Sequence, residues 1–548
     1  MIANRAAAFF EHAREQGFER RLVADSGLVR GCVWLLFALG AAARLSPLAD
    51  WDQRLFWQYL SEDGYLMQTV ARNMAIGLGM SVSEGTIPTN GVQPLATFVY
   101  AALHWLAGGS KQLAIAYVTV VSAAIAALTA WILYRLSARL LAGLPFAADA
   151  ALLTAALWFA SPLVIRHGMN GLETGFYYLA IAATLAHYFS AAAGSLRTAQ
   201  RLTLGLLLGL AFLARNDAVF FIGALLAAHV LMGGAAGGGA RTRIADALIA
   251  GLVSIAIASP WLAYNRLTFG SIVPISGSAQ SLTATLGANL ALIPANLLEA
   301  SLLYVPIPGR IEAAWPTIVG SLTALLALGW AYWALLARTS LPRRRFALTA
   351  LLFTAGIAGY YGLFFGAPHF VSRYLSSLTP LLWPICAAAA YASLAGSLRD
   401  AASFRAVGAA AAVLLLAEAS VVTGVDISRG HTDGSSYMHK QVVDWVQRNV
   451  DAPQWVGAVQ TGTLGYFHER TVNLDGKVNP EALRARRAKG HVLSYVLDET
   501  QIEYLVDWAG IAGWVELKAD PRFGETFEVR VKDPSANLGV LGRKRAAR

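Results

Sequence analysis

Apolar stretches separated by short polar loops recur along the first 424 residues of the chain. They fall near residues 28–47, 92–108, 113–134, 147–165, 172–193, 202–214, 217–232, 244–265, 315–337, 346–366, 374–394 and 404–424. A helix needs about 20 apolar residues to cross the hydrocarbon core of a bilayer. We therefore predict an all-α polytopic membrane domain over residues 1–424, with about 11–13 transmembrane helices and an uncleaved first helix.

The pattern changes after residue 424, where charged residues become frequent and no further spanning stretch occurs. An amphipathic, helix-like segment and several short strand-like segments follow, at 440–450, 455–459, 471–474, 502–506 and 526–531. Such an alternation is typical of α/β folds. Residues 425–548 are therefore predicted to form a small, soluble C-terminal α/β domain.

Composition supports a membrane protein and argues against both nucleic-acid binding and a cysteine-based disulfide or metal site. Hydrophobic residues make up 56% of the 548 residues and charged residues only 14%, whereas soluble domains average about 25% charged residues. The formal net charge is +10, but the basic residues lie in short loops, where they set topology rather than bind nucleic acid. Cys32 and Cys386 lie inside apolar stretches, which argues against a disulfide framework or a metal cluster.

The basic loops predict how the chain is oriented in the membrane. Arginines gather at 135–139, 197–201, 241–243, 338–345 and 399–405, which should be cytoplasmic. The loop at 48–91 carries five acidic residues against two arginines, so it should face outward. We predict that this loop, the loops at 266–314 and 367–373, and the C-terminal domain lie on the extracytoplasmic side of the inner (plasma) membrane.

One passage through the membrane contains two apolar stretches, 92–108 and 113–134. Either one stretch is re-entrant or juxtamembrane, or the arginines at 135–139 break the topology rule. Pro94, near the start of the first stretch, favours a non-spanning role for that stretch.

Two adjacent carboxylates, Glu62 and Asp63, stand in the first outward loop. The apolar residues of 60–78 follow helical spacing, which predicts a helix near the membrane surface. One carboxylate could act as a general base that takes a proton from an acceptor hydroxyl. The alternative is a pair of solvated loop acids.

Further polar residues lie at the predicted outer ends of apolar stretches: Glu173, Arg215, Asp217, His369, Arg373 and Tyr374. Glu173 could simply cap a helix, and Arg215 could either bind a phosphate or pair with Asp217. Arg373 is a second candidate phosphate ligand. Because these residues come from distant segments but share one predicted face of the membrane, they indicate an outward-facing site with carboxylates and cations. No phosphate-binding Gly-rich loop, zinc motif or nucleophile elbow is present.

Several short motifs resemble those of the GT-C glycosyltransferases, and most of all the mycobacterial terminal arabinofuranosyltransferase type. The first loop carries Glu-Asp-Gly-Tyr at 62–65, Ala-Arg-Asn at 71–73, Gly-Leu-Gly at 77–79 and Thr-Asn-Gly-Val-Gln-Pro-Leu at 89–95. The later matches are Gly-Leu-Glu-Thr at 171–174, Phe-Leu-Ala-Arg-Asn-Asp at 212–217, Trp261 to Gly270 with Pro274, Arg-Tyr-Leu at 373–375, and Gly457–Phe467 with Asn-Leu-Asp-Gly at 473–476 in the tail.

The resemblance implies inverting or retaining transfer of a sugar from a polyprenyl-phosphate donor at the periplasmic face, with or without a divalent cation. The loop-one acid would be the base, and of the two acids we favour Asp63 over Glu62. Arg215, Arg373 and Arg72 would hold the donor phosphate. The sugar would be arabinofuranose or, next, a hexose, and the partners a glycan, lipid or protein acceptor of the cell envelope and the membrane lipid.

The chain departs from the family pattern at three places. Gly64 replaces the usual alanine, Asn216 replaces the usual proline, and Gly91-Val92-Gln93 interrupts the Thr-x-Pro stretch. The subfamily, and with it the sugar, is therefore left open. Two other classes of function are a transporter or flippase of a lipid-linked sugar and a non-catalytic scaffold.

Overall fold

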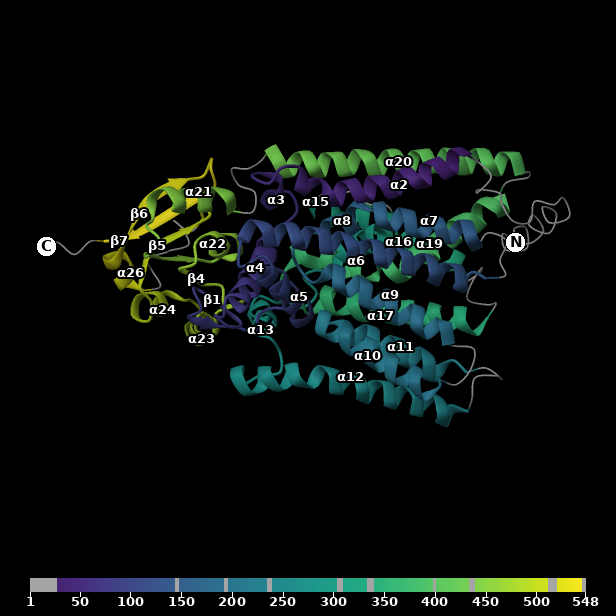
Figure 1. Cartoon of the computed structure of the whole chain (residues 1–548), viewed down its shortest axis with the longest axis horizontal. Helices are drawn as coiled ribbons and strands as arrows, with labels where there is room; N and C mark the ends of the chain where they lie inside the picture. Colours follow the sequence, from purple (N-terminus) through teal and green to yellow (C-terminus); the bar gives the residue numbers. More distant parts are fainter. Residues whose placement is uncertain are drawn as a thin grey trace.

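The computed structural model describes residues 27–142, 147–191, 196–233, 239–302, 309–332, 340–397, 401–432, 439–510 and 520–544. A long bundle of helices occupies most of the molecule, and a small mixed domain sits at one end of it (Figure 1). The larger helices of the bundle are α2 Gly27–Leu45, α5 Pro94–Leu106, α6 Lys111–Leu140, α7 Ala147–Ala160, α8 Pro162–Gly168, α9 Thr174–Ala191, α10 Thr198–Ala214, α11 Ala218–Leu231, α12 Ala240–Phe269, α16 Trp315–Tyr332, α17 Leu341–Leu363, α19 Thr379–Ser397 and α20 Ala401–Thr432.

Five of the described helical segments are long and apolar enough to cross a membrane: Gly27–Ala49, α6, α12, α17 and Ala406–Ser428 within α20. The pair α7 and α8, bent by 54°, would make a sixth span. The number of these described spans is lower than the predicted number of about 11–13 transmembrane helices. The reason is that several apolar stretches form shorter helices. Helix α5, for example, has 13 residues and is about 20 Å long against a hydrocarbon core of about 30 Å.

The end of the bundle next to the small domain is built from short elements of the loops. These are α3 Arg54–Trp57, α4 Glu62–Ala75, the hairpin β1 Ser81–Val82 and β2 Ile87–Pro88, α13 Ile275–Ser281, α14 Ile293–Ser301, α15 Gly309–Glu312 and α18 Val371–Leu375. Helix α4 is the one predicted at 60–78. It begins where the Ser61 hydroxyl accepts a hydrogen bond from the Gly64 amide at 3.0 Å, which caps a free N–H of the first turn.

The opposite end of the bundle is rich in arginines, whose side chains bind backbone carbonyls or a carboxylate of neighbouring helices. Arg343 at the start of α17 donates to the carbonyl of Leu140 at the end of α6, and Arg345 donates to the carbonyl of Met232 beyond α11. Arg201 of α10 pairs with the buried Asp246 of α12 at 2.7 Å. These basic helix ends therefore lie together, away from the small domain (Figure 1).

The C-terminal domain contains a five-stranded sheet in the order β4-β3-β5-β7-β6. Strand β3 runs parallel to β4 and β5, whereas β7 runs antiparallel to β5 and β6. Its elements are α21 Lys440–Asn449, β3 Trp455–Ala458, α22 Gly462–Phe467, β4 Thr471–Asn473, α23 Pro480–Lys489, α24 Leu493–Asp498, β5 Ile502–Asp507, α26 Pro521–Thr526, β6 Phe527–Asp533 and β7 Leu538–Arg543. The small sheet predicted near the C-terminus is confirmed.

The C-terminal domain is seated on the loop elements by both charged and aromatic contacts. Glu469 pairs with Arg72 of α4 at 2.9 Å and with Lys111 of α6 at 3.3 Å. The rings of Tyr65 and Tyr466 lie 5.3 Å apart. Helices α4 and α22 pack directly on each other, so the domain fixes the position of α4 and of the residues at its N-terminus.

Candidate active site

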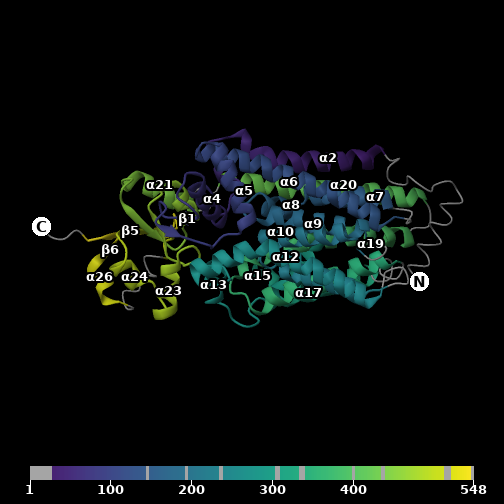
Figure 2. The same ribbon diagram turned by 60° about the horizontal axis from the view of Figure 1, so that its bottom comes forward.

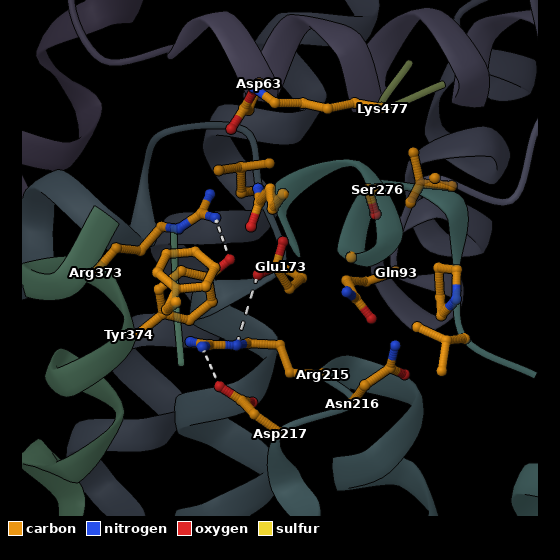
Figure 3. Close-up of a pocket in the computed structure, with 18 of the residues that line it drawn as sticks. Asp63, Gln93, Glu173, Arg215, Asn216, Asp217, Ser276, Arg373, Tyr374 and Lys477 are labelled. Carbon is orange, nitrogen blue, oxygen red and sulfur yellow. Dashed lines mark hydrogen bonds and ion pairs between the residues drawn. The ribbon is translucent and has the colours of Figure 1, made fainter. Parts of the chain in front are cut away.

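A cavity of about 350 Å³ opens at the junction between the helical bundle and the C-terminal domain. Its walls come from the N-terminus of α4, the turn between α10 and α11, helix α13, the end of α17, helix α18 and the loop after β4. Figure 3 shows that Asp63 and Lys477 lie on one side of it, while Arg215 and Asp217 lie on the other. Glu173, Arg373 and Tyr374 stand between these two sides.

Arg215 stands at the floor of the cavity because the α10–α11 turn leaves it extended, with φ −154°, between two short helices. It is 2% exposed, forms a close ion pair with Asp217 and lies 3.7 Å from Glu173. Its guanidinium lies over the ring of Tyr374, 4.6 Å from the centroid. Within the described part of the chain, its Nη1 has no hydrogen-bond partner, so a donor remains for a ligand.

Arg373 extends from α18 and is 8% exposed. Its Nη2 donates to the Tyr374 hydroxyl at 3.1 Å, and among the described residues its Nε has no partner. Burial lowers the pKa of Arg373, but Tyr374, Glu173 and Asp63 together raise it above its ordinary value. The side chain is therefore a permanent cation with an unused donor.

Asp63 lies on the other side of the cavity, in the first turn of α4. The ammonium of Lys477 lies 3.4 Å from its carboxylate and 3.4 Å from that of Asp475. Burial raises the pKa of Asp63, but Lys477 and Arg373 lower it below its ordinary value. Lys477 in turn has its pKa raised, since the two carboxylates outweigh its burial. Asp63 is thus ionised at neutral pH and able to accept a hydrogen bond from a hydroxyl.

Glu62 points away from the cavity and into the C-terminal domain. Its carboxylate accepts hydrogen bonds from the amide of Gly462, from the amide of Thr463 at 3.0 Å and from the Thr463 hydroxyl. The ring of His439 lies 3.4 Å away. Although burial raises the pKa of Glu62, its bonds to His439 and Thr463 lower it below its ordinary value. Glu62 therefore holds the two domains together rather than facing a substrate.

Two further predicted residues lie outside the cavity. Arg72 pairs with Glu469 and donates to the carbonyl of Gly109 at 3.2 Å. Its guanidinium is therefore engaged at the contact between the helical bundle and the C-terminal domain. His369 lines a neighbouring cavity, where its ring lies 4.1 Å from that of Phe370. Burial and the charge of Lys477 lower the pKa of His369. The other six predicted residues, namely Asp63, Glu173, Arg215, Asp217, Arg373 and Tyr374, all line one cavity.

The sequence interpretation missed Lys477 and Tyr361. Lys477 directly follows the Asn-Leu-Asp-Gly motif at 473–476, and that position is the signal that could have identified it. Tyr361 belongs to an apolar stretch, and its hydroxyl donates to Asp217 at 2.8 Å. No comparable signal distinguishes it from the other aromatic residues of α17.

The residues of the cavity do not suit a divalent cation. No group of three or more His, Cys, Asp or Glu side chains that could hold a metal occurs among the described residues. The carboxylates of Asp63 and Asp217 are each already matched by a cationic side chain, Lys477 and Arg215.

Comparisons with known proteins bear on the fold. A domain of unknown function, DUF8728, matches residues 428–536, and no curated protein sequence matches the chain. Among solved structures, ArnT from Cupriavidus metallidurans bound to undecaprenyl phosphate is 13% identical, with a TM-score of 0.57 over 94% of this chain and 98% of that one. AglB, the oligosaccharyltransferase of Archaeoglobus fulgidus, in complex with an inhibitory peptide and a dolichol-phosphate, is 12% identical, with a TM-score of 0.54 over 94% of this chain and 74% of that one.

The chain has the fold of these two proteins. AglB is an oligosaccharyltransferase, and the shared fold agrees with the predicted resemblance to the GT-C superfamily. The apolar helices of the described residues independently support a membrane protein. These matches do not confirm the finer predicted likeness to the mycobacterial terminal arabinofuranosyltransferase type.

Proposed function

We propose that the protein is a membrane glycosyltransferase that moves a sugar from a polyprenyl-phosphate donor to a glycan, lipid or protein acceptor. One observation carries the proposal: a single cavity places the carboxylate of Asp63 opposite the buried guanidinium groups of Arg215 and Arg373. A carboxylate and two cations are the groups that such a transfer needs. The cations stabilise the phosphate as it leaves, and the carboxylate accepts the proton of the attacking hydroxyl.

The donor phosphate would lie against Arg215 and Arg373, because each has an unpartnered donor atom within the described residues. The bond between the sugar carbon and the phosphate oxygen breaks, and a bond forms between that carbon and the acceptor oxygen. The acceptor proton passes to Asp63 and then to water. Because the pKa of Asp63 is lowered, it is a weak base that takes the proton late, as the new bond forms.

The lipid chain of the donor would leave the cavity on its apolar side. Val219 of α11, Phe364 beyond α17 and Val273 before α13 all line the cavity and are also exposed, at 50%, 56% and 49%. Exposed apolar side chains at the mouth of a cavity between apolar helices are compatible with contact to lipid. ArnT bound to undecaprenyl phosphate and AglB in complex with a dolichol-phosphate support the same donor class by analogy.

We place the site at the outer face of the inner membrane. The arginines that close the helix ends, including Arg201, Arg343 and Arg345, lie at the end opposite the C-terminal domain. By the positive-inside rule, that end faces the cytoplasm and the cavity faces outward. Arabinofuranose is the first sugar to test and a hexose the second.

The test is turnover of radiolabelled polyprenyl-phosphate sugars by the purified protein in detergent, with an envelope extract as the acceptor source. One donor should be consumed, and Asp63→Asn should slow that reaction by about 10²–10⁴-fold. Undecaprenyl phosphate should still bind to this variant. Glu528→Gln, which changes an exposed carboxylate on β6, is the matched control. If no donor is consumed, or if Asp63→Asn is fully active, the proposal is wrong and lipid flipping becomes the next activity to assay.

A further inference from the structure

A second cavity, of about 400 Å³, lies next to the first one. It is bounded by the end of α13, by residues 366–370 and by the parts of the C-terminal domain between 459 and 493. Figure 2 shows α23 of that domain close to α13 at this junction. The two cavities share Gln280 and Lys477 in their walls. They therefore meet at Lys477, whose ammonium contacts the carboxylates of Asp63 and Asp475.

The order of groups in the first cavity determines where an acceptor must enter. The donor phosphate is assigned to Arg215 and Arg373, and the sugar would lie between them and Asp63 (Figure 3). The attacking oxygen must therefore arrive on the side of Asp63. That side is closed by Lys477, whose ammonium lies 3.4 Å from both Asp63 and Asp475. Asp475 lines the second cavity, so the acceptor side of the reaction opens into it.

The walls of the second cavity are suited to a sugar. Gln280 and Gln460 offer amide donors and acceptors, and Asp475 offers a carboxylate. Phe370 and Leu474 provide apolar surface between these polar groups. Hydroxyl groups need hydrogen-bond partners of both kinds, whereas the faces of sugar rings pack on apolar surface.

The chain segment that borders the second cavity carries an excess of positive charge. Between 475 and 493 the chain has five Lys and Arg residues against two acidic ones. Lys477 and Arg484 are matched by acidic partners. Arg487 and Lys489 of α23 are exposed and, in the part of the chain that the structure describes, have no ion pair. They lie just before Gly490, which lines the cavity.

We propose that this second cavity binds the acceptor, and that the acceptor is an acidic glycan whose sugars carry carboxylate or phosphate groups. The proposal rests on the proposed function, because it takes Asp63 as the base and the Arg215 side as the donor side. The sugar hydroxyl reaches Asp63 past Lys477, while Arg487 and Lys489 attract the negative charge of the flanking residues of the glycan.

The test measures binding to the full chain in lipid nanodiscs by calorimetry. The probes are trigalacturonate, the matched neutral galactotriose and, for the donor site, undecaprenyl phosphate. Trigalacturonate should bind about 2- to 30-fold more tightly than the neutral trimer, as two surface ionic contacts predict, and the difference should vanish in high salt. The double substitution Arg487→Gln with Lys489→Gln should remove most of this preference. Arg530→Gln, an exposed site on β6, should not.

A second variant locates the bound trimer. Thr283 is an exposed residue of the cavity wall, so Thr283→Trp should fill the cavity and weaken trigalacturonate binding by about tenfold or more. Undecaprenyl phosphate should bind as before. The inference fails if the neutral trimer binds equally well, if Thr283→Trp leaves trigalacturonate binding unchanged, or if trigalacturonate displaces undecaprenyl phosphate. Since these are binding measurements, they remain decisive even if Asp63→Asn proves active and the proposed function fails.

Discussion

Replacing Gly91 with alanine would drive a methyl group into the backbone of the C-terminal domain. A Cβ atom at this position would lie 2.0 Å from the carbonyl oxygen of Lys477. An ordinary contact is 3.4 Å or longer, so the loop that carries Lys477 must retreat by about 1.4 Å. Gly91 belongs to the insertion Gly91-Val92-Gln93, one of the three departures from the family pattern, and this close approach explains why glycine stands there.

The displacement acts on the reaction through Lys477. Its ammonium lies 3.4 Å from Asp63, and a retreat of this size would take it out of hydrogen-bond reach. A misplacement of about 1 Å can cost about 100-fold in rate. We therefore expect Gly91→Ala to lower turnover of the donor by about 100-fold. Overpacking of this kind also costs about 1–3 kcal/mol of stability, so the protein should unfold at a lower temperature.

The assay compares turnover, thermal unfolding and undecaprenyl phosphate binding in the same preparation. Gly223→Ala is the matched control, because nothing lies within 4 Å of a Cβ at that position in α11. The control should keep full turnover, since alanine in a helix is no worse than glycine. Binding of undecaprenyl phosphate should survive in Gly91→Ala, because Arg215 and Arg373 do not contact the loop that moves. Wild-type turnover and unfolding of Gly91→Ala would refute the reasoning.

Three further predictions concern charged residues. Glu62 stabilises the domain contact above its ordinary pKa of about 4.3 and loses this effect as pH falls through its lowered pKa. His439 stabilises the contact below about pH 6.5 and loses this effect as pH rises through its raised pKa. Limited proteolysis should thus find the C-terminal domain best protected between these values, with His439→Gln removing only the loss at high pH. Arg215→Gln should destabilise the protein by about 3–5 kcal/mol, because buried Asp217 loses its cationic partner, whereas Arg215→Lys should fold and weaken undecaprenyl phosphate binding by about 10–100-fold in titrations. Arg72→Gln should leave that binding unchanged and should instead increase proteolysis at the domain junction; weakened binding would contradict its placement outside the cavity.

The helices and most strands could be predicted from the sequence because their signals are local. Apolar stretches mark the bundle, and α4 follows from the helical spacing of the apolar residues in 60–78. Strand β7, Leu538–Arg543, was missed because Gly539 and Gly542 interrupt its apolar residues. Among the described residues, fewer helices than predicted are long and apolar enough to span a membrane, since length in sequence does not show where a helix such as α5 will end.

The candidate site could be predicted only in part because its arrangement depends on distant contacts. Glu62 and Asp63 are neighbours, and side chains one position apart on a helix point about 100° away from each other. Which of them faces the cavity is decided by Gly462 and Thr463, about 400 residues later in the chain. The sequence likewise places Arg72 among possible phosphate ligands, because its partner Glu469 is equally remote.

The contact between the start of α4 and the C-terminal domain also has a consequence for how the protein is made. The bonds from Glu62 to Gly462 and from Asp63 to Lys477 join residues 400 and 414 positions apart. A ribosome that has already inserted the first outward loop must therefore complete nearly the whole chain before the cavity acquires its last wall. We expect nascent and truncated chains to hold a half-built site that can bind a lipid phosphate but cannot position an acceptor.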